Sequence, residues 1–164
     1  MTLSLLKSRE LVLGAAILAL LLAIASRFPA FIEPSNLAKV FNDTAPLIIL
    51  ALGQMAVILT RCIDLSVAAN LALTGMVVAM LNTLYPGLPI PVILLVSILL
   101  GAFMGLANGL LVWKLDIPPI VVTLGTMTVY RGIIFLISDG ARNNANEMSE
   151  SFKAYPRAVV QGLP

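Results

Sequence analysis

The sequence predicts an all-α fold: a polytopic integral membrane helix bundle of about five transmembrane helices plus a short interfacial helix. Of its 164 residues, 60% are hydrophobic and only 11% are charged, and the mean hydropathy is +1.03. Soluble domains carry about a quarter charged residues. Residues 44–60 hold no ionisable group, and no charged residue occurs from Leu65 to Trp113. Because about 20 predominantly apolar residues cross a bilayer, these runs predict membrane helices.

The first span is predicted at 11–31. A basic start with Lys7 and Arg9 precedes an apolar run, and Ala23-Ile24-Ala25 resembles a small-residue cleavage site. That arrangement is typical of a signal peptide. The apolar run continues to Ile32, which favours an uncleaved first helix. Both interpretations direct the chain to a membrane.

The second span is predicted at 45–60 and is preceded by the short interfacial helix at 34–43. Pro34 suits a first helical position. Leu37, Val40 and Phe41 share one face, as in helices that lie in the membrane interface. A plain loop is the alternative for this segment.

Three further spans are predicted at 65–84, 91–113 and 118–138. Proline-rich turns separate them. The composition becomes polar after Ser138, so 1–138 is predicted to be the transmembrane domain and 139–164 a truncated extramembrane loop or tail.

Orientation follows from the basic residues near the spans. With a cytoplasmic N-terminus, one side carries Lys7, Arg9, Arg61 and Lys114, and the other carries Arg27, Lys39, Arg142, Lys153 and Arg157. Without the long polar segment the balance is four against two. We therefore expect the N-terminus to be cytoplasmic.

Several function classes are excluded by composition. The net charge of +2 does not indicate a nucleic-acid partner, the chain has no histidine, and Cys62 is its only cysteine. No phosphate-binding glycine loop and no metal-ligand spacing occur. We expect no catalytic, cofactor or metal residues, so any energy from ATP hydrolysis must come from another polypeptide.

Polar residues recur on single faces of three predicted helices. Residues four or seven apart lie on the same face of a helix. At 100° per residue, Thr123, Thr126 and Tyr130 also lie within a narrow arc. These stripes predict a hydrated transport path, with interhelical hydrogen bonding as the alternative. The candidate path residues are Gln54, Ser66, Asn70, Thr74, Thr123, Thr126 and Tyr130.

Gly101, Gly105 and Gly109 form a tandem small-residue pattern, which favours close approach of another helix. Arg131 is a costly charge within the fifth span. It either reaches the membrane interface or faces the bundle, and the sequence does not separate these readings.

Arg61 and Asp64 stand between two uncharged runs, where charges are costly unless used or paired. They are candidates for a gate or a turn. The alternative is structural: Asp64 would cap the following helix, and Arg61 would favour the C-terminal end of the preceding one.

Several blocks resemble the ribose/xylose/arabinose-type permeases of bacterial ABC sugar importers. These blocks are Ile63-Asp64-Leu65-Ser66-Val67, Ala72-Leu73-Thr74-Gly75, Pro119-Ile120-Val121-Val122-Thr123-Leu124-Gly125-Thr126, Tyr130-Arg131-Gly132 and Ser138-Asp139-Gly140. Thr60-Arg61-Cys62-Ile63-Asp64 and Ile117-Pro118-Pro119 look most like the rhamnose branch.

The resemblance implies the N-terminal half of a permease fold that imports a monosaccharide by alternating access. It implies a second permease subunit (identical or different), cytoplasmic ATPase subunits that bind ATP and Mg²⁺, and a periplasmic sugar-binding protein. It also implies a bacterial inner-membrane location. A secondary transporter and a membrane scaffold subunit are the alternatives.

Two departures from the family and one difference in length accompany this resemblance. Family members usually have glycine where this chain has Cys62 and Ala68, so a freely hinging turn is not expected. Such permeases are longer, so the chain is expected to be an N-terminal fragment that lacks the ATPase-coupling helix.

Overall fold

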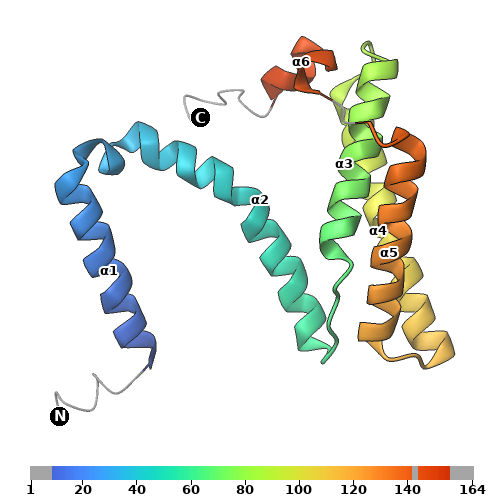
Figure 1. Cartoon of the computed structure of the whole chain (residues 1–164), viewed down its shortest axis with the longest axis horizontal. Coiled ribbons are helices and arrows are strands. Elements are labelled where there is room, and N and C mark those ends of the chain that lie inside the picture. The colour runs from blue at the N-terminus through green and yellow to red at the C-terminus, as the bar shows by residue number, and fades with distance from the viewer. Residues whose placement is uncertain (1–8, 142–143, 156–164) are drawn as a thin grey trace. The chain divides into compact units, whose positions relative to one another are not determined.

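A computed structural model describes residues 9–141 and 144–155 (Figure 1). The chain forms two compact units, with the boundary in the sequence between Leu47 and Ile48. Three residues of the predicted charge balance, Lys7, Arg142 and Arg157, lie outside the described residues. The part of the predicted polar segment beyond residue 155 lies outside them as well.

The first unit contains α1 (Arg9–Arg27), the 3-10 helix η2 (Pro29–Ile32) and the first half of α2 (Pro34–Leu59). The predicted span 11–31 is therefore interrupted, because α1 ends at Arg27 and Pro29 opens η2. No residue of α1 is buried within this chain. A helix that is apolar on all sides is suited to lipid or to partner helices.

The short interfacial helix predicted at 34–43 is not a separate element. Residues from Pro34 onward are helical, but they form the first turns of α2, which continues to Leu59 with Pro46 in its interior. Membrane helices tolerate proline when neighbouring groups bind the freed backbone atoms. Pro46 has no N–H, so it cannot donate to the carbonyl of Asn42 four residues earlier. Both sequence patterns were helical, so they did not reveal that the two helices are continuous.

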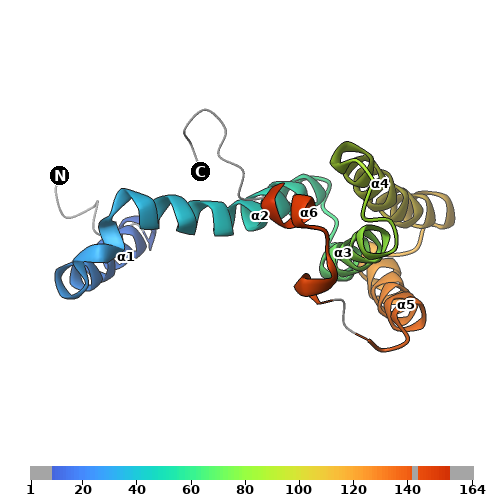
Figure 2. The ribbon, with the colours of Figure 1, turned by 90° about the horizontal axis from the view of Figure 1, so that it is seen from above.

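The second unit is built around α3 (Val67–Leu84), α4 (Ile90–Leu115) and α5 (Pro119–Ser138). α3 packs against both α4 and α5, which also contact each other, and Figure 2 shows the three helices grouped in this way. The central cluster of buried residues consists of Ala69, Leu73, Met104 and Tyr130. Most other large apolar side chains are exposed, as expected for helices that face lipid or other membrane helices.

This three-helix group has two different ends. At the turn end, residues 60–66 join α2 to α3 and residues 116–118 join α4 to α5. At the loop end, residues 85–89 join α3 to α4, and the segment after α5 leads to η3 (Ala145–Glu147) and α6 (Glu150–Ala154) (Figure 1).

The predicted all-α membrane class is confirmed. Five of the described helices, α1 to α5, are long and apolar enough to cross a bilayer, and the part of the chain that the structure describes contains no strand. Prolines begin α2 and α5, where a missing N–H costs nothing. α4 and α5 each end at an aspartate in the left-handed conformation, Asp116 and Asp139.

Candidate functional site

The turn between α2 and α3 begins as a Schellman motif centred on Arg61. Arg61 is left-handed, with φ of 60°. Its N–H donates to the Ile58 carbonyl at 2.8 Å, and the Cys62 N–H donates to the Val57 carbonyl at 3.3 Å. These are the two bonds that define the motif, whose left-handed residue is usually glycine. Arg61 therefore terminates α2 in a conformation that disfavours a side chain.

Asp64 holds the second half of the turn. Its Oδ1 accepts from the Ser66 backbone N–H at 2.7 Å and from the Ser66 hydroxyl at 2.6 Å. This is an Asx-type turn, in which a carboxylate binds the backbone two residues further on. The alternative in which Asp64 is the N-cap of α3 is wrong: the N-cap residue is Ser66, whose side chain makes no capping bond. Asp64 lies two residues before the N-cap, because the Asx-type turn from Asp64 to Ser66 comes between it and α3.

Arg61 and Asp64 do not form an ion pair. Lys153–Glu150 is the ion pair found among the described residues, and Arg61 is exposed. The two charges thus act separately, one ending α2 and the other shaping the approach to α3. Whether they also form a gate stays a prediction.

Two side chains from other elements hold the backbone of this turn. Gln54 on α2 donates from Nε2 to the Asp64 carbonyl at 3.0 Å. Thr123 on α5 donates from Oγ1 to the Ile63 carbonyl at 3.3 Å. The turn is thereby connected to both α2 and α5, which is not the arrangement of a freely moving hinge.

A buried polar chain connects the turn to α4. Asn108 donates from Nδ2 to the Ser66 hydroxyl at 2.8 Å, and that hydroxyl donates onward to Asp64. Ser66 is fully buried and Asn108 is 6% exposed. The second amide atom, Asn108 Oδ1, is buried without a hydrogen-bond partner among the described residues. Such an atom costs about 1–3 kcal/mol, so its presence requires a reason.

A pocket of about 210 Å³ opens beside this chain at the turn end. Its walls are the residue 60–64 turn, the last turn of α2 at Val57, the α4 face from Gly105 to Val112, and the start of α5. Asp64, Asn108 and Thr123 are among its polar lining residues. The remaining wall is largely aliphatic.

The other predicted path residues lie between the helices and are engaged in hydrogen bonds. Asn70 donates from Nδ2 to the Gly101 carbonyl at 3.5 Å and accepts from the Thr74 hydroxyl at 3.4 Å. Tyr130 donates to the Met104 carbonyl at 3.1 Å, and Thr126 binds back to its own helix. The Asn70–Gly101 and Tyr130–Met104 contacts match the interhelical alternative, whereas Thr74 and Thr126 bind within their own helices. The path assignment stays a prediction.

The three glycines of α4 have different surroundings. A Cβ added at Gly101 would lie 3.7 Å from Asn70 Oδ1, so α3 already covers this position. A Cβ at Gly105 or at Gly109 would meet no described atom within 4 Å, and both glycines line the pocket. Close packing of a helix on Gly105 and Gly109 stays a prediction.

Arg131 lies on the exposed side of α5. Within this chain it does not face the three-helix core. The interface interpretation fits this placement, and so does contact with another membrane subunit.

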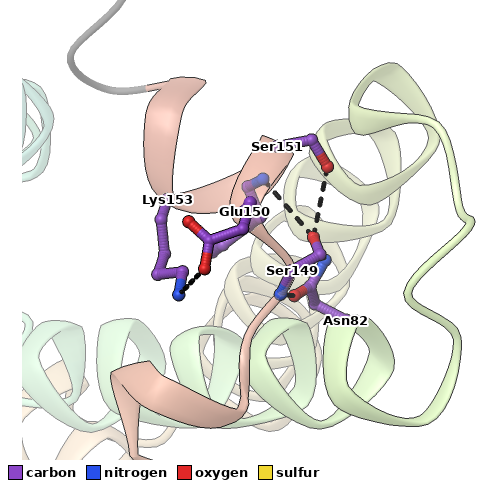
Figure 3. A network of polar contacts seen from close by, with 6 residues as sticks. Asn82, Ser149, Glu150, Ser151 and Lys153 are labelled. Atoms are coloured by element: carbon purple, nitrogen blue, oxygen red, sulfur yellow. Dashed lines mark hydrogen bonds and ion pairs between the residues drawn. The ribbon is translucent and has the colours of Figure 1, made fainter.

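A second buried polar contact fixes the loop end. Asn82 at the end of α3 is 1% exposed, and its amide donates to the Ser149 hydroxyl at 2.9 Å while its Oδ1 accepts from the Ser149 N–H at 2.8 Å. Ser149 caps α6 through Phe152 N, and Lys153 pairs with Glu150 at 2.6 Å (Figure 3). The segment after α5 is thus docked onto α3.

Comparison with known proteins identifies the family. A protein-family model, described as the permease component of the branched-chain amino acid transport system, matches residues 36–158. The autoinducer 2 import system permease protein of Enterobacter sp. (strain 638) is 42% identical over 137 residues, which cover 84% of this chain and 39% of that protein. The chain belongs to this permease family. The predicted resemblance to sugar-importer permeases is confirmed, while the rhamnose branch stays a prediction.

A second relative of the permease is the D-allose transport system permease protein of Escherichia coli (strain K12). It is 36% identical over 151 residues, which cover 90% of this chain and 45% of that protein. The permease therefore spans less than half the length of these relatives. No solved structure matches it. Family membership and five apolar helices make it a multi-pass protein of the bacterial inner membrane.

The permease turn also explains one departure from the family pattern. Its left-handed residue is Arg61, and Cys62 does not have a positive φ. Position 62 thus accepts a side chain without strain. Ala68 is the second residue of α3, where alanine is a strong helix former.

Sequence reasoning did not include Asn108, Thr60 or Asn82 among the functional candidates. Asn108 directly precedes the last glycine of the small-residue pattern on α4. Its position next to Gly109 was a signal, because a buried amide on a small-residue face has room to meet another helix. Its partner Ser66 was not identifiable from one sequence.

Proposed function

We propose that this permease is the membrane subunit of an ABC importer that carries an uncharged monosaccharide or a similar small sugar inward. The family match over residues 36–158, together with relatives named for import of autoinducer 2 and D-allose, carries this proposal. Alternating access powered by a separate ATPase is the mechanism that such a subunit would use.

The chemistry at the turn end favours a sugar over a branched-chain amino acid. An amino acid zwitterion needs groups that pair with both its charges, whereas the pocket holds one carboxylate, an amide, and hydroxyl groups. Amides, hydroxyls and carboxylates are suited to the many hydroxyl groups of a sugar. Rhamnose is the first candidate from the sequence, and D-allose is the second.

The proposed assembly contains a second permease subunit, cytoplasmic ATPase subunits with their ATP and Mg²⁺, and a periplasmic sugar-binding protein. In this proposal the N-terminus is cytoplasmic. The turn end then faces the cytoplasm, and the docked segment after α5 faces the periplasm. The polar contacts of Asn82 and Ser149 would hold that segment in place.

Uptake by the full-length permease tests the proposal. The permease is reconstituted with its ATPase and its binding protein in vesicles, and uptake of labelled L-rhamnose, D-allose and leucine is compared with and without ATP. We expect ATP-dependent uptake of one sugar and none of leucine. An ATPase variant that binds but does not hydrolyse ATP is the control. Sugar uptake that persists after removal of the ATPase would instead identify a secondary transporter.

A further inference from the structure

The pocket at the turn end has the composition of a small-ligand site. Its volume of about 210 Å³ is several times the share of one water in the liquid, about 30 Å³. It is smaller than the sites of drug-sized ligands, which begin at about 300 Å³. A mainly aliphatic wall with a few convergent polar groups is the usual pattern of such sites.

The unpartnered oxygen of Asn108, Oδ1, favours a ligand that donates hydrogen bonds to this pocket. The amide nitrogen donates to Ser66, and the oxygen Oδ1 is the polar atom of this side chain that has no partner among the described residues. Asp64 accepts both of its hydrogen bonds at Oδ1, which leaves Oδ2 available among the described residues. The hydroxyl of Thr123 donates to a backbone carbonyl and can still accept. The pocket is therefore rich in acceptors and suited to a ligand that donates hydrogen bonds.

We propose that this pocket binds one neutral hydroxyl-bearing molecule of about monosaccharide size, with its hydroxyl groups on Asp64 and Asn108 and its carbon atoms on the aliphatic wall. The inference rests on the proposed function and assigns the solute a binding site at the turn end. Both aliphatic and polar walls are then used, and Asn108 Oδ1 gains a donor.

Two other occupants fit the observations less well. A bare cation would need several oxygens converging on one point, yet much of this wall is aliphatic, with Val57, Ile63 and Val112 contributing to it. A packed helix would need a continuous groove along α4, but Asn70 already covers Gly101. The open part of the glycine face extends only from Gly105 to Gly109. Both occupants are outcomes of the tests below.

Cys62 provides a reporter at the pocket, because it lines the wall and is half-buried. The full-length permease, assembled with its partners, is treated with a small maleimide, and modification of the Cys62 peptide is measured by mass spectrometry. We expect the sugar that is taken up to slow Cys62 modification at least about threefold at saturation, as a ligand that covers the site would. Replacing Na⁺ by choline should leave the rate unchanged. A rate that depends on Na⁺ and not on sugar would overturn the proposal in favour of a cation.

Filling the pocket gives a second, steric test. In Gly105→Ala/Gly109→Ala the new methyl groups meet no described atom within 4 Å, so the helix keeps its place while the pocket shrinks. We expect sugar protection of Cys62 to weaken about tenfold in apparent affinity, as for a loss of about 1.4 kcal/mol. Gly53→Ala on α2, which also has open space and lies outside the pocket, is the matched control. Loss of subunit assembly in the double variant, with protection unchanged, would show that a helix packs there.

Asn108→Leu tests the acceptor itself. The variant removes the unpartnered oxygen and the donor to Ser66 but keeps the branched shape of the side chain, so we expect about threefold to tenfold weaker protection of Cys62. Asn82→Leu is the control, because Asn82 is equally buried but lies at the loop end with both amide atoms bonded. ATP-dependent uptake of a sugar that neither protects Cys62 nor responds to these variants would refute the pocket and leave the proposed function standing. Absence of any ATP-dependent sugar uptake would refute the proposed function instead.

Discussion

Asn108 on α4 donates to the hydroxyl of Ser66, the N-cap residue of α3, at 2.8 Å, although the two residues are 42 positions apart. Through this bond α4 is connected to the Asp64 turn. The turn is therefore a junction of α2, α3, α4 and α5 and not a simple connection.

Ser66 and Asn108 should be energetically coupled. Ser66→Ala removes the acceptor of the Asn108 amide and leaves both amide atoms unpaired. We expect it to lower the free energy of unfolding by about 1–3 kcal/mol. In Asn108→Leu the same substitution should cost much less, because no amide remains to be orphaned. Thermal unfolding of the purified permease in detergent measures each variant, and equal costs of Ser66→Ala in both backgrounds would contradict the coupling.

Arg61 should be replaceable by glycine with a gain in stability. Its φ of 60° places it in the left-handed region, where a side chain costs about 1–2 kcal/mol and glycine avoids that cost. Arg61→Gly is expected to raise the unfolding temperature, and Arg61→Val to lower it, since a β-branched residue is least compatible with this conformation. Arg61→Gln keeps the strain and removes only the charge, so it isolates the electrostatic effect.

Transport by the Arg61 variants then separates a turn from a gate. If Arg61 only ends α2, uptake by Arg61→Gln should remain near that of the parent. A loss of uptake with an intact complex and unchanged unfolding temperature would show that the guanidinium has a role in the transport cycle.

The helices could be predicted from the sequence because each one depends on the composition of its own segment. Apolar runs and prolines placed α3, α4 and α5 close to their observed bounds. The break between 34–43 and 45–60 was wrong, because an amphipathic segment was separated from the apolar run that follows it, although one helix continues through both. A local pattern shows that a segment is helical and which face is apolar. It does not show whether two adjacent helical segments form one helix or two.

The partners of the polar residues could not be predicted in the same way. Helical periodicity showed that Ser66, Asn70 and Thr74 share a face, but not which helix that face meets. The contacts Ser66–Asn108 and Asn82–Ser149 depend on the rotation of each helix in the bundle. A single sequence contains no record of that rotation. The geometry of the turn could not be predicted for another reason. Glycine usually marks the left-handed position at a helix end, and here that position is occupied by an arginine.

The segment after α5 should detach when its buried anchor is removed. Asn82→Leu deletes two hydrogen bonds to Ser149, each worth about 0.5–1.5 kcal/mol. Proteolysis within residues 149–154 is expected to accelerate about tenfold, as an opening made easier by about 1.4 kcal/mol requires. Thr83→Val, which removes a bond within α3 only, is the matched control. Lys153→Gln should have little effect, because an exposed ion pair contributes about 0–1 kcal/mol.

Substitutions of Asp64 should separate the effect of its hydrogen bonds on the turn from the effect of its negative charge. Asp64→Asn keeps an oxygen for the Ser66 N–H, so the turn should form, although a neutral acceptor binds more weakly than a carboxylate by about 1 kcal/mol. Asp64→Ala removes the acceptor for both Ser66 donors and should destabilise the permease further. Unfolding temperature ranks the three proteins, and hydrogen exchange at residues 62–66 reports whether the turn has opened.

Sugar protection of Cys62 in Asp64→Asn then tests the role of the carboxylate in the pocket. A charged acceptor binds a hydroxyl about twice as strongly as a neutral one, so protection should weaken while the turn stays closed. The same exchange pattern with unchanged protection would confine Asp64 to shaping the turn. An opened turn in Asp64→Asn would instead show that the hydrogen bonds to Ser66 require the full negative charge.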